Sequence, residues 1–328
     1  MHMIARPIGL PVVAILTCLL FWGCTADPKI EEDTSSDQIA KKLSREAQSG
    51  RYVFEDGSLY EGELVLGLPD GYGVITYSSG DLYEGQFAKG SPNGYGIIRY
   101  KSIEDLEKYS GNWQNGKRSG FGALTMADQS VLEGHWDQDS LKYGEFRDAS
   151  GNISYGKWQN NRLSEGNLFL SNGDQFSGAF KKDGSYDYGT LSSTNGAIYF
   201  GEFENALFHG SGVFIDEEGI QYTGEFQKGV KSGMGVLKDL DGSIYTGEFL
   251  DGFPHGQGRQ SDLSGVTYVG SWEFGKKQGS GALDFNDGTS FVGEFEDGLA
   301  VDGIYQWNDG TTSRSFQDEN GAWEDFEE

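Results

Sequence analysis

The feature that most constrains the fold of this chain is a short phrase that repeats at a period close to 23 residues. Most copies have the pattern aromatic–x–Gly–x–aromatic, and the first, which begins at Tyr60, ends in Leu64 instead. A period of this length means that each copy is one small structural unit, which buries its apolar side chains only against neighbouring copies. The sequence therefore predicts an array of like units over residues 50–311. The central glycines of the eleven copies are Gly62, Gly85, Gly111, Gly134, Gly156, Gly178, Gly201, Gly224, Gly247, Gly270 and Gly293.

The alternation of residues within each copy indicates β-strands. In an extended strand, Tyr60, Gly62 and Leu64 share one face. Glu61 and Glu63 then share the other face. A second glycine follows ten or eleven residues after the first, and turn signals such as Asp-Gly and Asn-Gly separate the two segments. Each repeat is therefore predicted to be a β-hairpin with one aromatic face.

The glycine inside each strand needs its own explanation, because glycine in a strand interior normally weakens the strand. We expect that an aromatic ring from the neighbouring hairpin lies over the bare backbone at this position. A single hairpin is not stable alone, so the rings must be buried between stacked neighbours. The predicted fold is all-β: an elongated, twisted, antiparallel array of about eleven stacked β-hairpins, open at both ends.

Composition narrows the possible functions. Glycine accounts for 51 of the 328 residues, but it has no three-residue period and only 6 residues are proline, which excludes collagen. Aromatic residues make up 14% of the chain, which is too many for a disordered acidic chain. The formal net charge of −26 repels phosphate and disfavours nucleic acid and anionic lipid headgroups as partners.

The phrase YxGxF, followed by GxG and a glycine turn, resembles the MORN (membrane occupation and recognition nexus) repeat. Clear copies are YEGQF at Tyr83, YTGEF at Tyr222 and FVGEF at Phe291. The resemblance implies an extended β-hairpin array that acts as a scaffold, a protein-binding surface or a dimerising rod. It also implies a module without catalytic activity, for which lipid binding has been proposed.

Residues 1–23 are typical of a signal peptide. Arg6 precedes an apolar run that is shorter than the roughly 20 apolar residues of a membrane span. The run ends in Gly23-Cys24, which resembles the lipobox of bacterial lipoproteins. That resemblance implies lipidation of Cys24 as the new N-terminus, and Thr25 after it favours the outer membrane over the inner one.

Two alternatives to lipidation stay open. Cleavage after Ala26 would give a soluble secreted or periplasmic protein, and an uncleaved signal would act as an anchor. Residues 24–49 are polar and predict a tether. Residues 312–328 break the repeat and predict an acidic cap, in which Trp323 and Phe326 cover the open edge of the last hairpin.

No catalytic residue, cofactor site or metal site is predicted. No Ser/His/Asp or Cys/His set can be assembled with any positional logic, and two cysteines are too few for a disulfide scaffold or a Cys-rich zinc site. A row of glutamates on successive repeats predicts a solvated face, with a stripe for Ca²⁺ or a cationic partner as the alternative. Repeats about 10 Å apart are too far apart for one ion, because Ca–O distances are about 2.4 Å.

The candidate interaction surface combines the aromatic and glutamate rows of three adjacent repeats. Two interpretations of the rings stay open: they form the core of the array, or their exposed edges line a groove that binds a peptide or a glycan. The glutamates are expected on the opposite face. The residues are Tyr199, Phe203, Tyr222, Phe226, Tyr245 and Phe249, with Glu202, Glu225 and Glu248.

Two functions are consistent with these features. The first is a non-enzymatic scaffold or protein-interaction module, tethered to the bacterial cell envelope, that holds a protein partner whose identity the sequence does not give. The second is an envelope glycan or peptidoglycan binder that uses the aromatic groove. The ends of the array also predict homodimer formation, because edge strands invite pairing.

Overall fold

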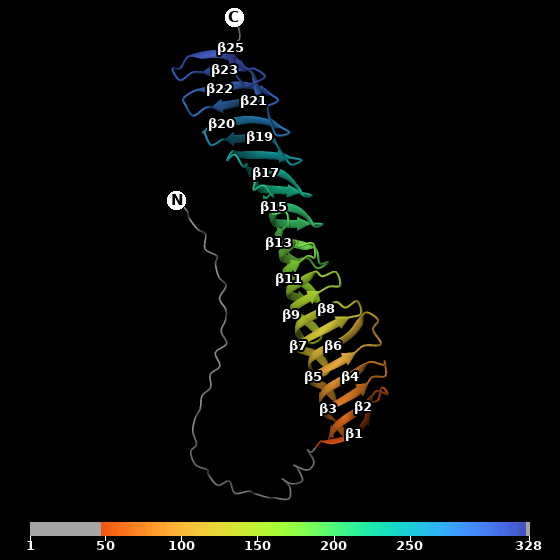
Figure 1. Cartoon of the computed structure of the whole chain (residues 1–328). Helices are drawn as coiled ribbons and strands as arrows, with labels where there is room; N and C mark the ends of the chain where they lie inside the picture. The colour runs from red at the N-terminus through yellow and green to blue at the C-terminus, as the bar shows by residue number, and fades with distance from the viewer. Residues whose placement is uncertain (1–46, 326–328) are drawn as a thin grey trace, which may run out of the picture. The chain divides into compact units, whose positions relative to one another are not determined.

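The computed structural model describes residues 47–325, and every strand in this part of the chain belongs to one 25-stranded sheet. Each strand pairs antiparallel with the next one along the sequence, from β1 (Gln48–Val53) at one end to β25 (Trp323–Asp325) at the other (Figure 1). The sheet is therefore an open hairpin meander, and the predicted all-β fold class is confirmed. None of the described residues lies in a helix that is long and apolar enough to cross a membrane.

The strands between these two ends form a regular series of outgoing and returning segments. They are β2 (Leu59–Val65), β3 (Leu68–Thr76), β4 (Leu82–Ala88), β5 (Ser91–Arg99), β6 (Leu106–Gln114), β7 (Lys117–Met126), β8 (Val131–Asp137), β9 (Ser140–Arg147), β10 (Ile153–Gln159), β11 (Arg162–Phe169), β12 (Gln175–Phe180), β13 (Tyr186–Ser192), β14 (Ile198–Glu204), β15 (Leu207–Ile215), β16 (Gln221–Gln227), β17 (Val230–Lys238), β18 (Ile244–Leu250), β19 (Phe253–Ser261), β20 (Thr267–Glu273), β21 (Lys276–Asp284), β22 (Ser290–Glu296), β23 (Leu299–Gln306) and β24 (Thr312–Gln317).

One glycine from each strand between β1 and β23 lies in a single row across the sheet. Gly50 stands opposite Gly62, Gly62 opposite Gly73, and the pairing continues strand by strand to Gly303. The row ends at Ser315 in β24. The glycines that recur along the sequence are therefore neighbours in space, and we call them the glycine row.

The ring that covers the glycine row comes from the same strand, so the prediction of a ring from the neighbouring hairpin is wrong. Tyr222 stands two residues before Gly224, and its hydroxyl would lie 2.5 Å from a Cβ on Gly224 and 2.6 Å from one on Gly235. Side chains in strands lean along the strand, so the ring reaches the glycine pair two residues on. The neighbouring hairpin instead supplies Phe249, whose ring packs edge-on against Tyr222 at a centroid distance of 4.8 Å.

The first glycine of each GxG has a different role. The pairing of β16 with β17 shifts after Gly224, so that Glu225 faces Ser232, and Gly233 and Met234 of β17 form a β-bulge. Gly233 has a φ of +58°, a left-handed conformation that favours glycine. The GxG motif thus joins a bulge glycine to a glycine of the row.

The buried face of the sheet holds two hydrophobic clusters. One extends from Tyr60 to Trp158, and the other from Phe176 to Tyr305. The boundary between them falls in the repeat where Ser154 takes the place of the usual first aromatic residue. The absence of an aromatic ring at position 154 therefore coincides with a break in the aromatic core.

The sheet extends beyond the predicted array at both ends. β1 begins two residues before the predicted start at residue 50, and the predicted acidic cap forms β24 and β25 of the same sheet. The Trp323 ring packs against Phe291 and Tyr305, with centroid distances of 4.8 Å and 5.0 Å. This ring therefore covers the last rings of the core.

Several predictions fall on residues that the structure does not describe. The predicted signal peptide, the lipidation site Cys24 and the tether up to residue 46 lie outside the described residues, as does Phe326.

Candidate interaction surface

The six rings of the candidate surface are buried in the second hydrophobic cluster. Each tyrosine packs edge-on against the phenylalanine of its own repeat and against the equivalent aromatic residue of the next, as Tyr222 does with Phe226 and Phe249. The interpretation in which exposed ring edges line a groove is therefore wrong, and the rings form the core. The exposed fractions are 1% for Tyr199, 3% for Phe203, 0% for Tyr222, 4% for Phe226, 3% for Tyr245 and 4% for Phe249.

Side chains from the second strand of each hairpin (the return strand) also cover the tyrosines. This explains how a single sheet can bury them. The ring of Phe208 stacks on Tyr199 at a centroid distance of 3.8 Å. The ammonium group of Lys231 lies over the ring of Tyr222, 5.4 Å from its centroid. Burial lowers the pKa of Lys231. The sequence pattern did not indicate this covering row, because its residue type changes from repeat to repeat.

The tyrosine hydroxyls connect the core to the hairpin backbone. The Tyr222 hydroxyl donates a hydrogen bond to the carbonyl oxygen of Glu225 at 2.9 Å. Burial raises the pKa of Tyr222 to about 12, with a further contribution from the Glu225 charge. The hydroxyl therefore remains a protonated donor at neutral pH, which suits a structural role.

The three glutamates lie on the opposite, exposed face and are fixed by backbone contacts. The amide N–H of Gln257 donates to Glu248 Oε1 at 3.0 Å, and that of Ser211 donates to Glu202 at 3.3 Å. The side chain of Glu225 lies against the bulge glycine of its own hairpin. The hydrogen bonds of Glu202 and Glu248 thus stabilise their bulges, and all three residues present carboxylates on the exposed face.

The glutamates do not converge on a metal site. Within residues 47–325, no group of three or more His, Cys, Asp or Glu side chains could hold one ion. Glu202 and Glu248 instead accept hydrogen bonds from amides of their own hairpins, which keeps their carboxylates separated along the sheet.

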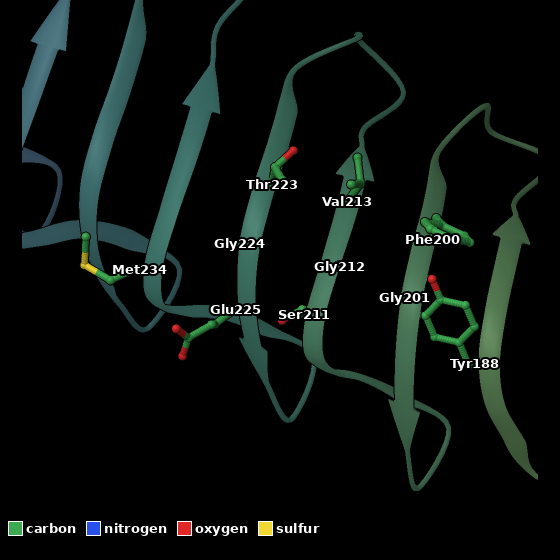
Figure 2. Close-up of a pocket in the computed structure, with 10 residues that line it drawn as sticks. All are labelled: Tyr188, Phe200, Gly201, Ser211, Gly212, Val213, Thr223, Gly224, Glu225 and Met234. Atoms are coloured by element: carbon green, nitrogen blue, oxygen red, sulfur yellow. The ribbon is translucent and has the colours of Figure 1, made fainter.

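A shallow groove of about 430 Å³ lies on the exposed face across β13–β17. Figure 2 shows glycines of the row along its middle, with one line of side chains on each side. Tyr188, Phe200 and Met234 are 46%, 44% and 56% exposed. Phe200, Val213 and Thr223 form one side, and Tyr188, Ser211, Glu225 and Met234 form the other.

The groove combines apolar side chains with a carboxylate at its rim. Exposed apolar side chains that gather on one face of a sheet are typical of contact surfaces. The carboxylate of Glu225 gives the groove a negative charge, which favours a partner with a basic side chain. Its apolar residues stand one place before or after a row glycine, and strand alternation puts those places on the glutamate face. This alternation is the sequence signal from which the groove residues could have been predicted.

The MORN repeat model matches more than half of the chain, in eight segments. The matched residues are 60–82, 83–102, 109–131, 199–220, 222–244, 245–265, 268–290 and 291–312. The chain belongs to the MORN repeat family. MORN repeats form a non-enzymatic repeat module, and the hairpin array agrees with this membership. The matched segments leave out residues 132–198, where the hairpins depart most from the common pattern.

Among curated proteins, the MORN array is similar to part of Alsin. It is 30% identical to Alsin of Mus musculus and 29% identical to Alsin of Homo sapiens over 171 residues. Each match covers 51% of this chain and 8% of Alsin, so the chain spans a small part of these relatives.

Solved structures show only a weak likeness to this MORN array. The TCP domain of SAS-4 from Drosophila melanogaster, solved with a proline-rich motif of Ana2, has a TM-score of 0.31 and 13% identity, over 52% of this chain and 86% of that domain. The TCP10 domain of Danio rerio CPAP has a TM-score of 0.22 and 9% identity, over 80% of this chain and 96% of that domain. These scores carry no functional argument.

Proposed function

We propose that this MORN repeat protein is a non-enzymatic scaffold that holds a protein partner on the exposed face of β13–β17. The observation that supports it best is the groove over the glycine row, with Phe200 and Met234 exposed beside the carboxylate of Glu225. The partner expected from this chemistry presents an apolar side chain next to a basic one.

Photocrosslinking from the groove tests the partner site. A photoreactive amino acid replaces Val213 or Thr223 in separate variants, and Asn195, in a turn outside the groove, is the matched control position. We expect one adduct of the same mass from both groove positions and none from Asn195. Absence of any adduct from the groove would contradict the proposal, as would an equal yield from the control position.

The proposal includes a tether to the bacterial cell envelope through a lipid on Cys24. It is supported by the apolar N-terminal run that ends in Gly23-Cys24 and by the polar segment that follows it. Fractionation of cells that express the chain or its Cys24→Ser variant tests this part, with the outer membrane as the expected location of the unchanged chain. An unchanged distribution of the variant would leave the scaffold without a lipid anchor.

Homodimer formation through the ends of the array is also part of this proposal. The outer edge of β1 has no neighbouring strand among the described residues, and edge strands pair readily with a second copy. The expected species in light scattering is a dimer, and Arg51→Pro in β1 should reduce it because proline removes a backbone donor from the edge. A monomer at all concentrations would contradict this part.

A further inference from the structure

A second set of exposed rings lies on the same face of the sheet, nearer to β1. Four successive return strands, β3, β5, β7 and β9, each carry an aromatic residue beside the glycine row, and these rings are 42–56% exposed. They face away from the core, so burial on folding does not account for them. The rings are those of Tyr72, Tyr95, Phe121 and Tyr143. The equivalent places in later repeats hold Glu165, Tyr188, Ser211, Met234, Gln257 and Ser280, so the run of adjacent rings ends after β9.

The spacing of these four rings is regular. Adjacent rings are two strands apart, which corresponds to about 9.6 Å in a β-sheet. Tyr95 is the fifth of nine residues in β5, and Tyr72 has the same place in β3, so the rings lie near the middle of their strands. Strand twist displaces the middle of a strand least, so it largely preserves this spacing.

The same repeat distance belongs to the polyproline II helix. This helix has three residues per turn and a rise of 3.1 Å per residue, so equivalent side chains recur at about 9.3 Å. A ligand of about ten residues would therefore place one turn against each of the four rings. Aromatic-lined surfaces are the usual binding sites for such segments, which bind with little loss of conformational entropy because they are already extended.

The side chains directly opposite the rings are uncharged and carry hydrogen-bonding groups. They are Gln86, Asn112 and His135, on β4, β6 and β8. One charged group also borders this surface, because the Tyr72 hydroxyl donates to the Glu84 carboxylate at 2.8 Å. The amide N–H of Tyr95 donates to Gln86 Oε1 at 2.8 Å, which leaves the NH₂ group of Gln86 as a donor. A polyproline II backbone makes no internal hydrogen bonds, so its carbonyl oxygens can accept from such donors.

We propose that the surface formed by Tyr72, Tyr95, Phe121 and Tyr143 binds a proline-rich segment of a partner protein in the polyproline II conformation. The segment crosses the strands from β3 to β9, with one helical turn against each ring. This binding site goes beyond the proposed function, because it lies outside the β13–β17 groove and specifies the chemistry of its ligand.

Fluorescence anisotropy with a labelled decaproline peptide and the purified full chain tests the proposal. A Gly/Ser peptide of the same length is the control probe. We expect saturable binding of decaproline alone, weakened at least about fivefold by Tyr95→Ala or Phe121→Ala. Met234→Ala removes an exposed side chain at the same place in a later repeat and should leave binding unchanged. Thermal unfolding of each variant shows whether it has folded.

Three outcomes would overturn the proposal. They are the absence of saturable decaproline binding, equal weakening by Met234→Ala, and binding of a neutral oligosaccharide such as chitohexaose through the same rings without decaproline binding. None of them bears on crosslinking from Val213 and Thr223, so the two proposals can fail separately.

Discussion

The hairpins from β8 to β13 and those from β14 to β21 share one glycine row but are held together differently. In the later hairpins, the turn glycine of one hairpin donates a backbone hydrogen bond to the hairpin before it. Gly229 N–H bonds the carbonyl of Phe208 at 2.8 Å, and Gly252 N–H bonds that of Lys231 at 3.0 Å. The tyrosine ring of each of these repeats lies over its own glycine pair.

In the earlier hairpins, side chains make most of these connections, and one backbone bond remains, from the N–H of Asp139 to the carbonyl of Arg118 at 3.1 Å. The N–H of Leu141 donates to Asn161 Oδ1 at 3.2 Å, and Arg162 donates to the carbonyl of Lys182 at 3.0 Å. Leu132 and Ser154 stand where later repeats have tyrosine. Paired glycines and the alternation of core and exposed residues therefore suffice to set strand register. The rings and turn glycines determine how neighbouring hairpins pack.

The largest change in stability should come from removing one ring of the regular region, β14–β21, as compared with the irregular region, β8–β13. Tyr222→Ala should lower the free energy of unfolding by about 4 kcal/mol, because a fully buried aromatic side chain is lost. Ser154→Ala is the matched change in the irregular region and should cost less than about 0.5 kcal/mol. Urea unfolding measures both, and equal losses would remove the distinction between the two regions.

A methyl group in the glycine row should have the next largest effect. Gly235→Ala places a Cβ 2.5–2.7 Å from the ring of Tyr222, and we expect a loss of about 3 kcal/mol in unfolding free energy. Gly184→Ala is the control, because that turn glycine has φ +91° with no atom within 4 Å of the added Cβ. Only backbone strain of about 1 kcal/mol is expected there. A control that loses as much stability would contradict ring contact as the cause.

Hydrogen exchange compares the two regions without mutation. Backbone amides of β10–β12, at the boundary between the two hydrophobic clusters, should exchange at least about tenfold faster than those of β16–β18. The physical reason is that local opening at the boundary separates fewer packed rings. Mass spectrometry of exchanged peptides checks this, and uniform protection along the sheet would show that the boundary has no energetic consequence.

Restoring the missing ring should make the β10–β12 region more like the later hairpins. Ser154→Tyr places the common aromatic residue beside Gly156, and we expect a gain of about 1 kcal/mol in unfolding free energy from the added packing. Amide exchange in β10–β12 should slow in the same variant. Tyr155→Phe, at an exposed neighbouring position, is the control for a change outside the core. A loss of stability in Ser154→Tyr would show that this repeat has no space for the ring.

The smallest expected effect is a dependence on acid. Burial opposes ionisation of Asp81, but hydrogen bonds from the Ser102 side chain and the Lys101 amide outweigh it and lower its pKa from 3.8 to about 2. The carboxylate therefore contributes stability above about pH 4, and this is lost as the pH falls towards 2. Ile220 and Val266, at the equivalent places in later repeats, carry no such group.

Amide exchange at pH 3 and pH 6 tests this dependence. Acid should speed exchange in β4–β6 more than in β18–β20, and Asp81→Asn should remove that difference. An equal response of both regions would contradict the role assigned to Asp81.

Much of the fold could be predicted from the sequence because its repeat is regular. The eleven glycines and the alternation around Tyr60 predicted hairpins and an aromatic face, and the sheet has both. The covering ring was assigned to the wrong hairpin, because periodicity does not show in which direction a side chain leans. The candidate site was less predictable: its rings are buried, while the exposed rings of Phe200 and Tyr95 occupy variable places in the repeat.

The hairpin repeat, the family and the two chemically different faces of the sheet all follow from the amino-acid sequence. These properties follow from local spacing, since alternation and glycine position act within a few residues of each other. Which aromatic residues are core and which are exposed depends instead on contacts between strands. Burial of Tyr222 depends on Phe249 and Lys231, which pack on it from other strands. Tyr72, Tyr95, Phe121 and Tyr143 come together as one surface only because successive strands pair in a single register.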